Sequence, residues 1–169
     1  IFQGENLWNI FNKISEYGKA LSDWDLEIYR GLLTGLNEAF LIDEATKDRL
    51  ISEDKNAERI IKPLFRGRET EKYFSKSSPS YIIATFPSLK LEIEKYPSIE
   101  NHLLTFGKEK LEQSGKPGSR KKTSNKWFET QDATAYWSEF EKPKLVWKRI
   151  GSRLRFSYDE SGTYTLDST

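Results

Sequence analysis

The sequence contains no cysteine and no methionine, and His102 is its only histidine. Without cysteine the chain can form neither a disulfide framework nor a thiolate metal site, and one histidine cannot build the usual zinc site. The sequence also lacks an apolar run of about 18 residues, which a membrane-spanning helix requires, and a basic-then-apolar secretory leader. We therefore expect no membrane partner and a cytoplasmic location.

Recognisable catalytic motifs are also missing. The sequence has no phosphate-binding loop of the G-x-x-x-x-G-K type, no G-x-S-x-G nucleophile turn and no carboxylate cluster of the kind that holds nuclease metal ions. Pairs such as Glu92 and Glu94 are explained by one exposed face. No glycine-rich loop for S-adenosylmethionine follows an apolar strand. This segment is therefore expected to catalyse nothing and to bind no cofactor or metal by itself.

The residues that are present favour one globular domain over residues 1–169, with 14% aromatic residues for a core and 31% charged residues for a surface. Because the chain begins at Ile1 and has no methionine, we expect an internal or C-terminal fragment of a larger protein. The net charge of +1 is unevenly distributed. Residues 116–126 hold five basic residues and residues 142–155 hold six, without an acidic residue in either run. Such runs indicate either a polyanion partner or an ordinary solvated face.

In the first half of the chain, apolar spacing predicts an amphipathic helix within residues 5–21, with Gly18 as its C-cap. Two strands, Asp25–Leu33 and Glu38–Ile42, are expected to form a hairpin around the turn Thr34–Asn37. Further elements are also expected. These are a helix capped by Asp43, a short helix over 56–61, a buried strand over Tyr81–Phe86 and a helix over 98–113 with Ile99, Leu103 and Phe106 inward.

In the second half, residues 114–126 are rich in glycine, proline, serine and lysine, which predicts a flexible basic loop. One helical turn is expected in residues 135–140, a strand over Lys144–Ile150, and a hairpin over 153–167 that turns at Asp159–Gly162. The mixed order of elements predicts an α+β fold, with a twisted, mostly antiparallel sheet and several short helices.

Two features suggest contact with nucleic acid. On the strand 144–150, Lys144 and Lys148 share one face, which would meet phosphates, while Leu145 and Trp147 would pack inside. An ordinary solvated face is the alternative for the lysines. In the turn, Gly31, Gly35 and Asn37 would let peptide N–H groups approach a phosphate, with the Thr34 hydroxyl adding a contact. The alternative is that Gly35 and Asn37 only supply the positive φ of the turn.

One longer stretch resembles a known family. Residues 28–73 hold Arg30-Gly31, then T-G-L-N-E-A-F-L-I-D over 34–43, then I-I-K-P with R-G-R over 60–68. This combination resembles the opening of the TaqI-like C-terminal specificity domain, and "EKYPSIENHLLTF" and "FEKPKLVWKRI" extend the likeness to about Ile150. The segment "KWFETQ" departs from the aromatic-Glu-Leu-Gln form of that family.

The resemblance implies the target-recognition domain of an adenine-specific DNA methyltransferase, in many cases part of a restriction–modification enzyme of a bacterium or archaeon. Such a domain binds double-stranded DNA and contacts base edges. Its expected partners are therefore the DNA duplex and the catalytic methyltransferase domain of the same chain, and it would be associated with the nucleoid when bound. The catalytic domain binds S-adenosylmethionine and holds the flipped adenine, and magnesium would be needed only where a nuclease domain is present.

The basic runs and the turn supply the expected DNA contacts. These residues are Arg30, Thr34, Gly35, Asn37, Lys62, Arg66, Arg68, Arg120, Lys121, Lys122, Lys126, Lys144, Lys148, Arg149, Arg153 and Arg155. The alternative function is a protein-interaction or scaffolding domain of a restriction or defence complex without DNA contact, which the acidic first sixty residues favour.

Overall fold

The computed structural model describes residues 5–65, 80–147 and 155–167. Its α-helices are α1 (Glu5–Tyr17), α2 (Asn37–Phe40), α3 (Glu44–Glu53), α4 (Pro97–Leu104) and α5 (Lys108–Leu111). Its short 3-10 helices are η1 (Leu21–Asp23), η2 (Lys55–Arg59), η4 (Pro87–Leu89), η5 (Ile93–Lys95) and η6 (Trp137–Glu141). Its strands are β1 (Leu41–Asp43), β2 (Ile61–Phe65), β3 (Ser80–Ile83), β4 (Lys144–Trp147), β5 (Phe156–Asp159) and β6 (Tyr164–Thr165).

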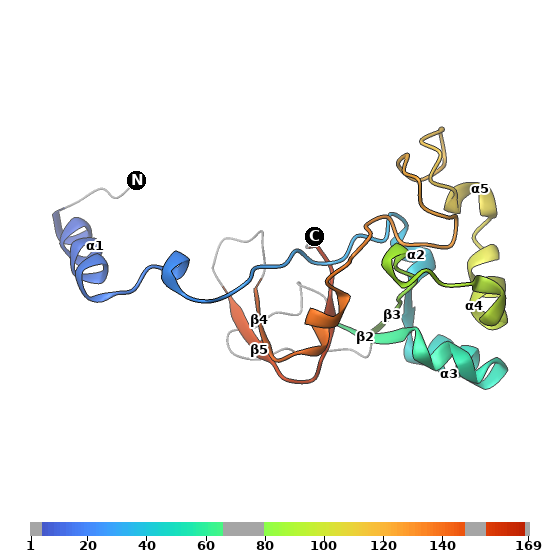
Figure 1. Cartoon of the computed structure of the whole chain (residues 1–169), viewed down its shortest axis with the longest axis horizontal. Helices are drawn as coiled ribbons and strands as arrows, with labels where there is room; N and C mark the ends of the chain where they lie inside the picture. The colour runs from blue at the N-terminus through green and yellow to red at the C-terminus, as the bar shows by residue number, and fades with distance from the viewer. Residues whose placement is uncertain (1–4, 66–79, 148–154, 168–169) are drawn as a thin grey trace.

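The strands form a four-stranded sheet in the order β1-β3-β2-β6 and a separate two-stranded sheet, β4-β5 (Figure 1). The β1-β3 and β2-β3 pairs are antiparallel and the β2-β6 pair is parallel. The predicted α+β class with a mostly antiparallel sheet is confirmed.

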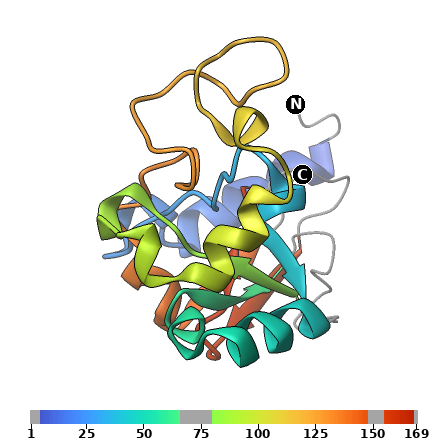
Figure 2. The ribbon, with the colours of Figure 1, turned by 90° about the vertical axis from the view of Figure 1, so that its right-hand side faces the viewer.

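The main core cluster lies between the larger sheet and helices α2, α3 and α4, and a second cluster includes Leu64, Ile82 and Tyr164. Helix α3 packs against α4 and against β1 and β3 (Figure 2). Helix α3 begins where it was predicted, because the Asp43 carboxylate accepts a hydrogen bond from the Thr46 N–H at 2.9 Å. Phe40, Leu50, Ile99 and Leu103 are fully buried there, so the helices cover one end of the sheet.

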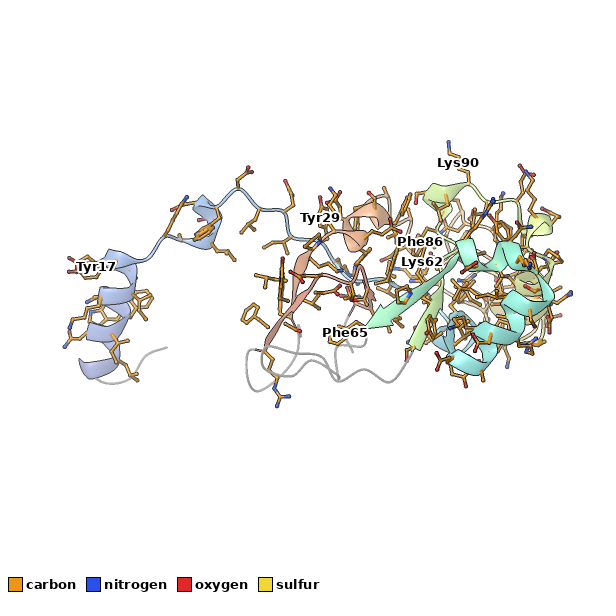
Figure 3. All side chains as sticks on the ribbon, turned by 90° about the horizontal axis from the view of Figure 1, so that it is seen from below. Tyr17, Tyr29, Lys62, Phe65, Phe86 and Lys90 are labelled. Carbon is orange, nitrogen blue, oxygen red and sulfur yellow. The ribbon has the colours of Figure 1, made fainter. Side chains whose placement is uncertain are left out.

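The N-terminal segment forms an arm that extends away from this body. Every residue from 7 to 30 is exposed, and Figure 1 shows α1 at the far end of an extended strip of chain. Figure 3 shows Tyr17 on α1 and Tyr29 where the arm reaches the body. The predicted amphipathic helix is present, and the Gly18 N–H closes it onto the Ile14 carbonyl at 2.7 Å. Its apolar face, however, contacts little of the described chain.

The predicted hairpin at residues 25–42 is wrong. Instead of pairing with residues 38–42, the first strand runs as exposed chain until Leu32, which bridges in parallel to Leu166. The second strand begins as helix α2, and β1 then pairs with β3. The cause is local. The Thr34 hydroxyl donates to the Asn37 carboxamide at 2.7 Å, and the chain enters helix α2 at Asn37 in place of a hairpin turn.

The predicted hairpin at residues 153–167 is also wrong within the described residues. β5 pairs with β4, whereas β6 joins β2 in the other sheet. The Asp159 carboxylate separates the two strands, because it accepts hydrogen bonds from the Ser161 N–H at 2.9 Å and the Thr163 N–H at 3.0 Å. This tight turn sends the chain away from β5.

The predicted helix at 98–113 is divided by Gly107 into α4 and α5. Gly107 has φ +88°, which a helix does not allow. Ile99 and Leu103 point inward as expected, and Phe106 packs partly against the same core. Among the helices of the described residues, none has the length and apolar character needed to cross a bilayer.

Candidate nucleic-acid interface

The basic stretch 114–126, which was expected to be a flexible loop, is built around a buried arginine. The Arg120 side chain is only 4% exposed. Its guanidinium donates five hydrogen bonds, at 2.5–2.9 Å, to the carbonyls of Leu111, Thr34, Glu129 and Trp127. Burial lowers the pKa of Arg120 to about 10, partly opposed by the Glu129 carboxylate, so Arg120 remains charged at neutral pH. Arg120 therefore holds the loop to the body and is not available to a phosphate.

Two amides complete the base of the loop. The buried Gln113 side chain donates to the carbonyl of Glu129 at 3.1 Å and accepts from the Thr123 hydroxyl at 2.8 Å. The Asn125 amide donates to the carbonyls of Thr130 and Gln131 at 3.1 and 2.9 Å. These bonds fix both ends of the loop to the segment that follows it.

The lysines of this loop face outward. Lys116, Lys121, Lys122 and Lys126 are exposed, and none of them forms an ion pair with another described residue. We call these four residues the loop lysines. Figure 2 shows their loop standing above α4 and α5. A fixed loop thus presents four cations to solvent.

Helix α5 adds two further exposed lysines at the foot of the loop, Lys108 and Lys110. The Lys108 ammonium lies 5.6 Å from the Trp127 ring centre, and that of Lys126 lies 5.4 Å from the Phe128 ring centre. Lys108, Lys110 and Lys116 were not among the predicted contacts. Lys116 could have been predicted, because it begins the same basic run. The sequence gave no indication for Lys108 and Lys110, because they lie in a predicted helix beside acidic residues.

The turn at residues 34–37 serves the fold. Thr34 is 1% exposed, and its hydroxyl bonds to Asn37 and to the Leu36 N–H. Gly35 has φ +79°, and a Cβ there would come within 2.7 Å of the Gln131 side chain. The Thr34 hydroxyl is therefore used internally and does not point toward a phosphate. Asn37 is exposed, but its side-chain oxygen already accepts from Thr34.

Gly31 does permit a close approach of backbone, but to the chain itself. A Cβ at Gly31 would lie 2.3 Å from the Leu166 carbonyl. Beside it, the Leu32 N–H donates to Thr165 at 2.7 Å, and Asp167 donates to Leu32 at 2.9 Å. Arg30 pairs with the Asp167 carboxylate at 2.5 Å. We call this contact of residues 30–32 with 165–167 the seam.

Lys62 and Lys144 are neutralised by acidic neighbours. Lys62 pairs with Glu141 at 3.2 Å, and Lys144 pairs with Asp159 in a largely covered ion pair. Although burial alone raises the pKa of Asp159, hydrogen bonds from Lys144, Ser161 and Thr163 outweigh it and hold that pKa below its usual value. Both ammonium groups are therefore paired with carboxylates, whereas the predicted DNA contacts require unpaired charges.

The expected faces of strand β4 are reversed. Lys144 and Val146 lie on the more covered face, which includes the buried Ser157. Leu145 is 62% exposed and Trp147 is 39% exposed. The internal ion pair explains the reversal, because Asp159 gives the Lys144 ammonium a partner on the inner side.

The remaining predicted residues add no described cluster. Arg155 is half-buried and directly precedes β5. Arg66, Arg68, Lys148, Arg149 and Arg153 lie outside the described residues. Of the predicted contacts, the structure brings together Lys121, Lys122 and Lys126, and it sets them apart from the β4-β5 hairpin (Figure 1).

Comparison with known proteins yields no relative: no protein-family model and no curated protein matches the chain. The likeness to a specificity domain thus rests on the quoted sequence motifs alone and stays a prediction.

Proposed function

We propose that this chain binds double-stranded DNA as the target-recognition part of an adenine-N6 DNA methyltransferase or restriction–modification enzyme. The observation that carries the proposal is the group of loop lysines, which are exposed, lack ion pairs among the described residues and stand on a loop anchored by Arg120. The family resemblance of the sequence adds the specific role.

The loop is suited to phosphates for two physical reasons. Each lysine that neutralises a phosphate releases a condensed counterion, and this release drives affinity. A loop whose shape is fixed before binding also loses less conformational entropy on contact than a disordered one. Glu109 and Glu112 lie near the foot of the loop, whereas residues 114–126 contain no acidic residue.

In this proposal the segment positions DNA and another domain performs the reaction. S-adenosylmethionine would bind in the catalytic domain of the parent enzyme, which would methylate a flipped adenine. A nuclease activity with magnesium would belong to a further domain. The described residues contribute grip and orientation, since phosphate contacts fix the register of a protein on its duplex.

Selection from a random-sequence duplex library, at low and at physiological salt, tests the proposal. We expect salt-sensitive retention, and an enriched sequence among the retained duplexes would establish target recognition. Retention without an enriched sequence would support phosphate contact and remove the recognition role from this segment. No retention at low salt, for this chain and for the parent protein, would contradict DNA binding.

A protein-interaction role without DNA contact is the second candidate. The uncovered apolar side chains of the arm and of β4-β5 favour it, because large exposed apolar patches mark interaction sites. Salt distinguishes the two functions. DNA affinity falls steeply as salt rises, whereas an apolar contact is little weakened by salt.

A further inference from the structure

Two apolar surfaces of the described chain are exposed to solvent, one on a helix and one on a two-stranded sheet. The first is on α1, where Leu7, Ile10 and Ile14 lie at helical spacing and are 48–64% exposed. Their opposite side carries Asn9, Asn12, Lys13 and Glu16. We call the apolar side the helix face. A helix of this pattern normally buries that side against a second element.

The second surface is the outward side of the β4-β5 hairpin. Leu145 pairs across the strands with Tyr158, and Trp147 pairs with Phe156. Because alternate residues of a strand share a side, these four lie together, and their exposures range from 39% to 62%. The Trp147 and Phe156 rings are 6.1 Å apart. We call this surface the hairpin face. It is apolar outside and holds an ion pair inside.

The arm keeps the two surfaces of one chain apart. Residues 18–30 carry α1 outward from the seam, and no residue among them is buried (Figure 1). At the root of the arm, Tyr29 stacks on Tyr136 at 5.0 Å, and the Tyr136 hydroxyl donates to the Arg30 carbonyl at 3.0 Å. An extended arm with a fixed root and an uncovered helix is the geometry of element exchange between copies.

We propose that two copies of this chain form a reciprocal dimer, in which the helix face of each copy packs on the hairpin face of the other. A twofold arrangement uses both surfaces of both chains and closes, as isologous contacts do. A contact between two α1 helices alone would leave both hairpin faces uncovered. The inference does not rest on DNA binding.

The available area favours two contacts over one. Since a large aromatic side chain offers roughly 150–250 Å² when uncovered, the exposed parts of the hairpin face amount to about 500 Å². A helix laid on that face buries a similar area of its own, which gives about 1,000 Å² for one contact. The reciprocal pair buries about 2,000 Å², and stable interfaces bury about 1,200–2,000 Å².

Sedimentation of the purified chain tests the dimer. We expect a species of twice the 19.7 kDa chain mass at tens of micromolar. Ile14→Glu on the helix face and Tyr158→Glu on the hairpin face should each yield monomers that keep the parent far-UV circular dichroism. Leu104→Glu, at a 40% exposed apolar position outside both faces, should remain dimeric. A monomeric parent chain, or a Tyr158→Glu variant that stays dimeric, would overturn the proposal.

Mixing the two variants tests reciprocity. In a one-to-one mixture, the intact helix of Tyr158→Glu can pack on the intact hairpin of Ile14→Glu. One intact contact should give a heterodimer that is weaker than the parent dimer but stronger than the self-association of either variant. Since the chain has no cysteine, chains carrying Ile14→Cys and Leu145→Cys separately should form a mixed disulfide when combined. A mixture that associates no more than either variant alone, together with no mixed disulfide, would contradict the reciprocal dimer. So would a double-cysteine chain that crosslinks within itself, because that result shows α1 folding back onto its own hairpin.

Discussion

At the scale of single residues, the main finding is that an arginine within a lysine-rich run is the least exposed member of that run. Arg120 binds four carbonyls from three segments of the chain, at Thr34, at Leu111 and at residues 127–129. Its planar guanidinium presents five donors in fixed directions, which a lysine ammonium cannot reproduce. The same run therefore contains one residue that stabilises the fold and four that face solvent.

Arg120→Ala should lower the free energy of unfolding by about 3–5 kcal/mol, because it leaves several buried carbonyls without donors. Urea denaturation followed by tryptophan fluorescence measures this loss. Arg120→Lys should recover only part of it, and Lys121→Ala should change stability by less than about 0.5 kcal/mol. Equal effects at positions 120 and 121 would contradict the assigned roles.

Asp159 should make stability depend on pH. Its pKa is lowered in the folded chain by hydrogen bonds from Lys144, Ser161 and Thr163, which outweigh the raising effect of burial. A carboxyl whose folded pKa is depressed stabilises the fold above its unfolded pKa, which is about 3.9, and this stabilisation is lost as pH falls further.

Asp159→Asn should therefore cost about 2–3 kcal/mol at pH 7, and this cost should shrink progressively as pH falls below about 3.9. Thermal melts of the two proteins between pH 2.5 and pH 7 measure the difference. Glu160→Gln, at an exposed neighbouring position, is the matched control. A constant difference between Asp159→Asn and the parent across this range would show that the carboxylate charge has no part in the turn.

At the scale of elements, the seam joins the root of the arm to the last strand. Two backbone hydrogen bonds of Leu32 hold it, with Arg30 and Asp167 paired at its side. Gly31 lies where a side chain would meet the backbone of residues 166–167 at 2.3–2.4 Å. The seam thus depends on the missing side chain as much as on its hydrogen bonds.

Gly31→Ala should destabilise the protein by about 2–3 kcal/mol, because the backbone must separate or strain to admit a Cβ. Arg30→Ala, which removes an ion pair that is exposed on its arginine side only, should cost about 1 kcal/mol. Hydrogen exchange at the Leu32 and Asp167 amides should increase strongly in the first variant and little in the second. Protected amides in Gly31→Ala would contradict the close packing of the seam.

Elements with local causes were predictable from the sequence, and strand pairings were not. The Asp43 cap and the α1 face depend on neighbours within four residues, and both are confirmed. The pairing of β6 with β2 and the contact of Leu32 with Leu166 join residues about a hundred or more positions apart. No local pattern distinguishes such a partner from the adjacent strand.

The candidate site shows the same division. The sequence located the lysines of residues 116–126 correctly as a charged run. It could not reveal that Arg120 turns inward, because carbonyls from distant segments create its pocket. It also predicted β4 with the wrong side outward, since the ion pair between Lys144 and Asp159 forms only when β5 lies beside β4.

At the scale of the whole molecule, the position of charge matters more than its sum. The chain has a net charge of +1, which alone gives little attraction for DNA. Replacing the four loop lysines by alanine changes the net charge by four. An equal change is made by replacing Lys13, Lys19, Lys55 and Lys95, which are exposed elsewhere.

The loop variant should lose most of its DNA affinity. The dependence of log K on log salt should become shallower by about 0.9 for each phosphate contact removed, and by about 3–4 in total. The control variant, with the same net charge, should retain the parent slope to within about 1 unit. Titration of a fluorescent duplex at several salt concentrations measures both. Equal losses in the two variants would mean that no particular site holds the duplex.

The seam also has a consequence for the biosynthesis of the protein. β6 can join the four-stranded sheet, and Leu32 can pair with Leu166, only after residue 166 has left the ribosome. Contacts of such wide sequence separation form slowly, since the intervening chain must first be ordered. During translation, β2 would keep an open edge and residues 30–32 would lack their partner until residues 164–167 are made, so this segment should depend on a chaperone over that interval.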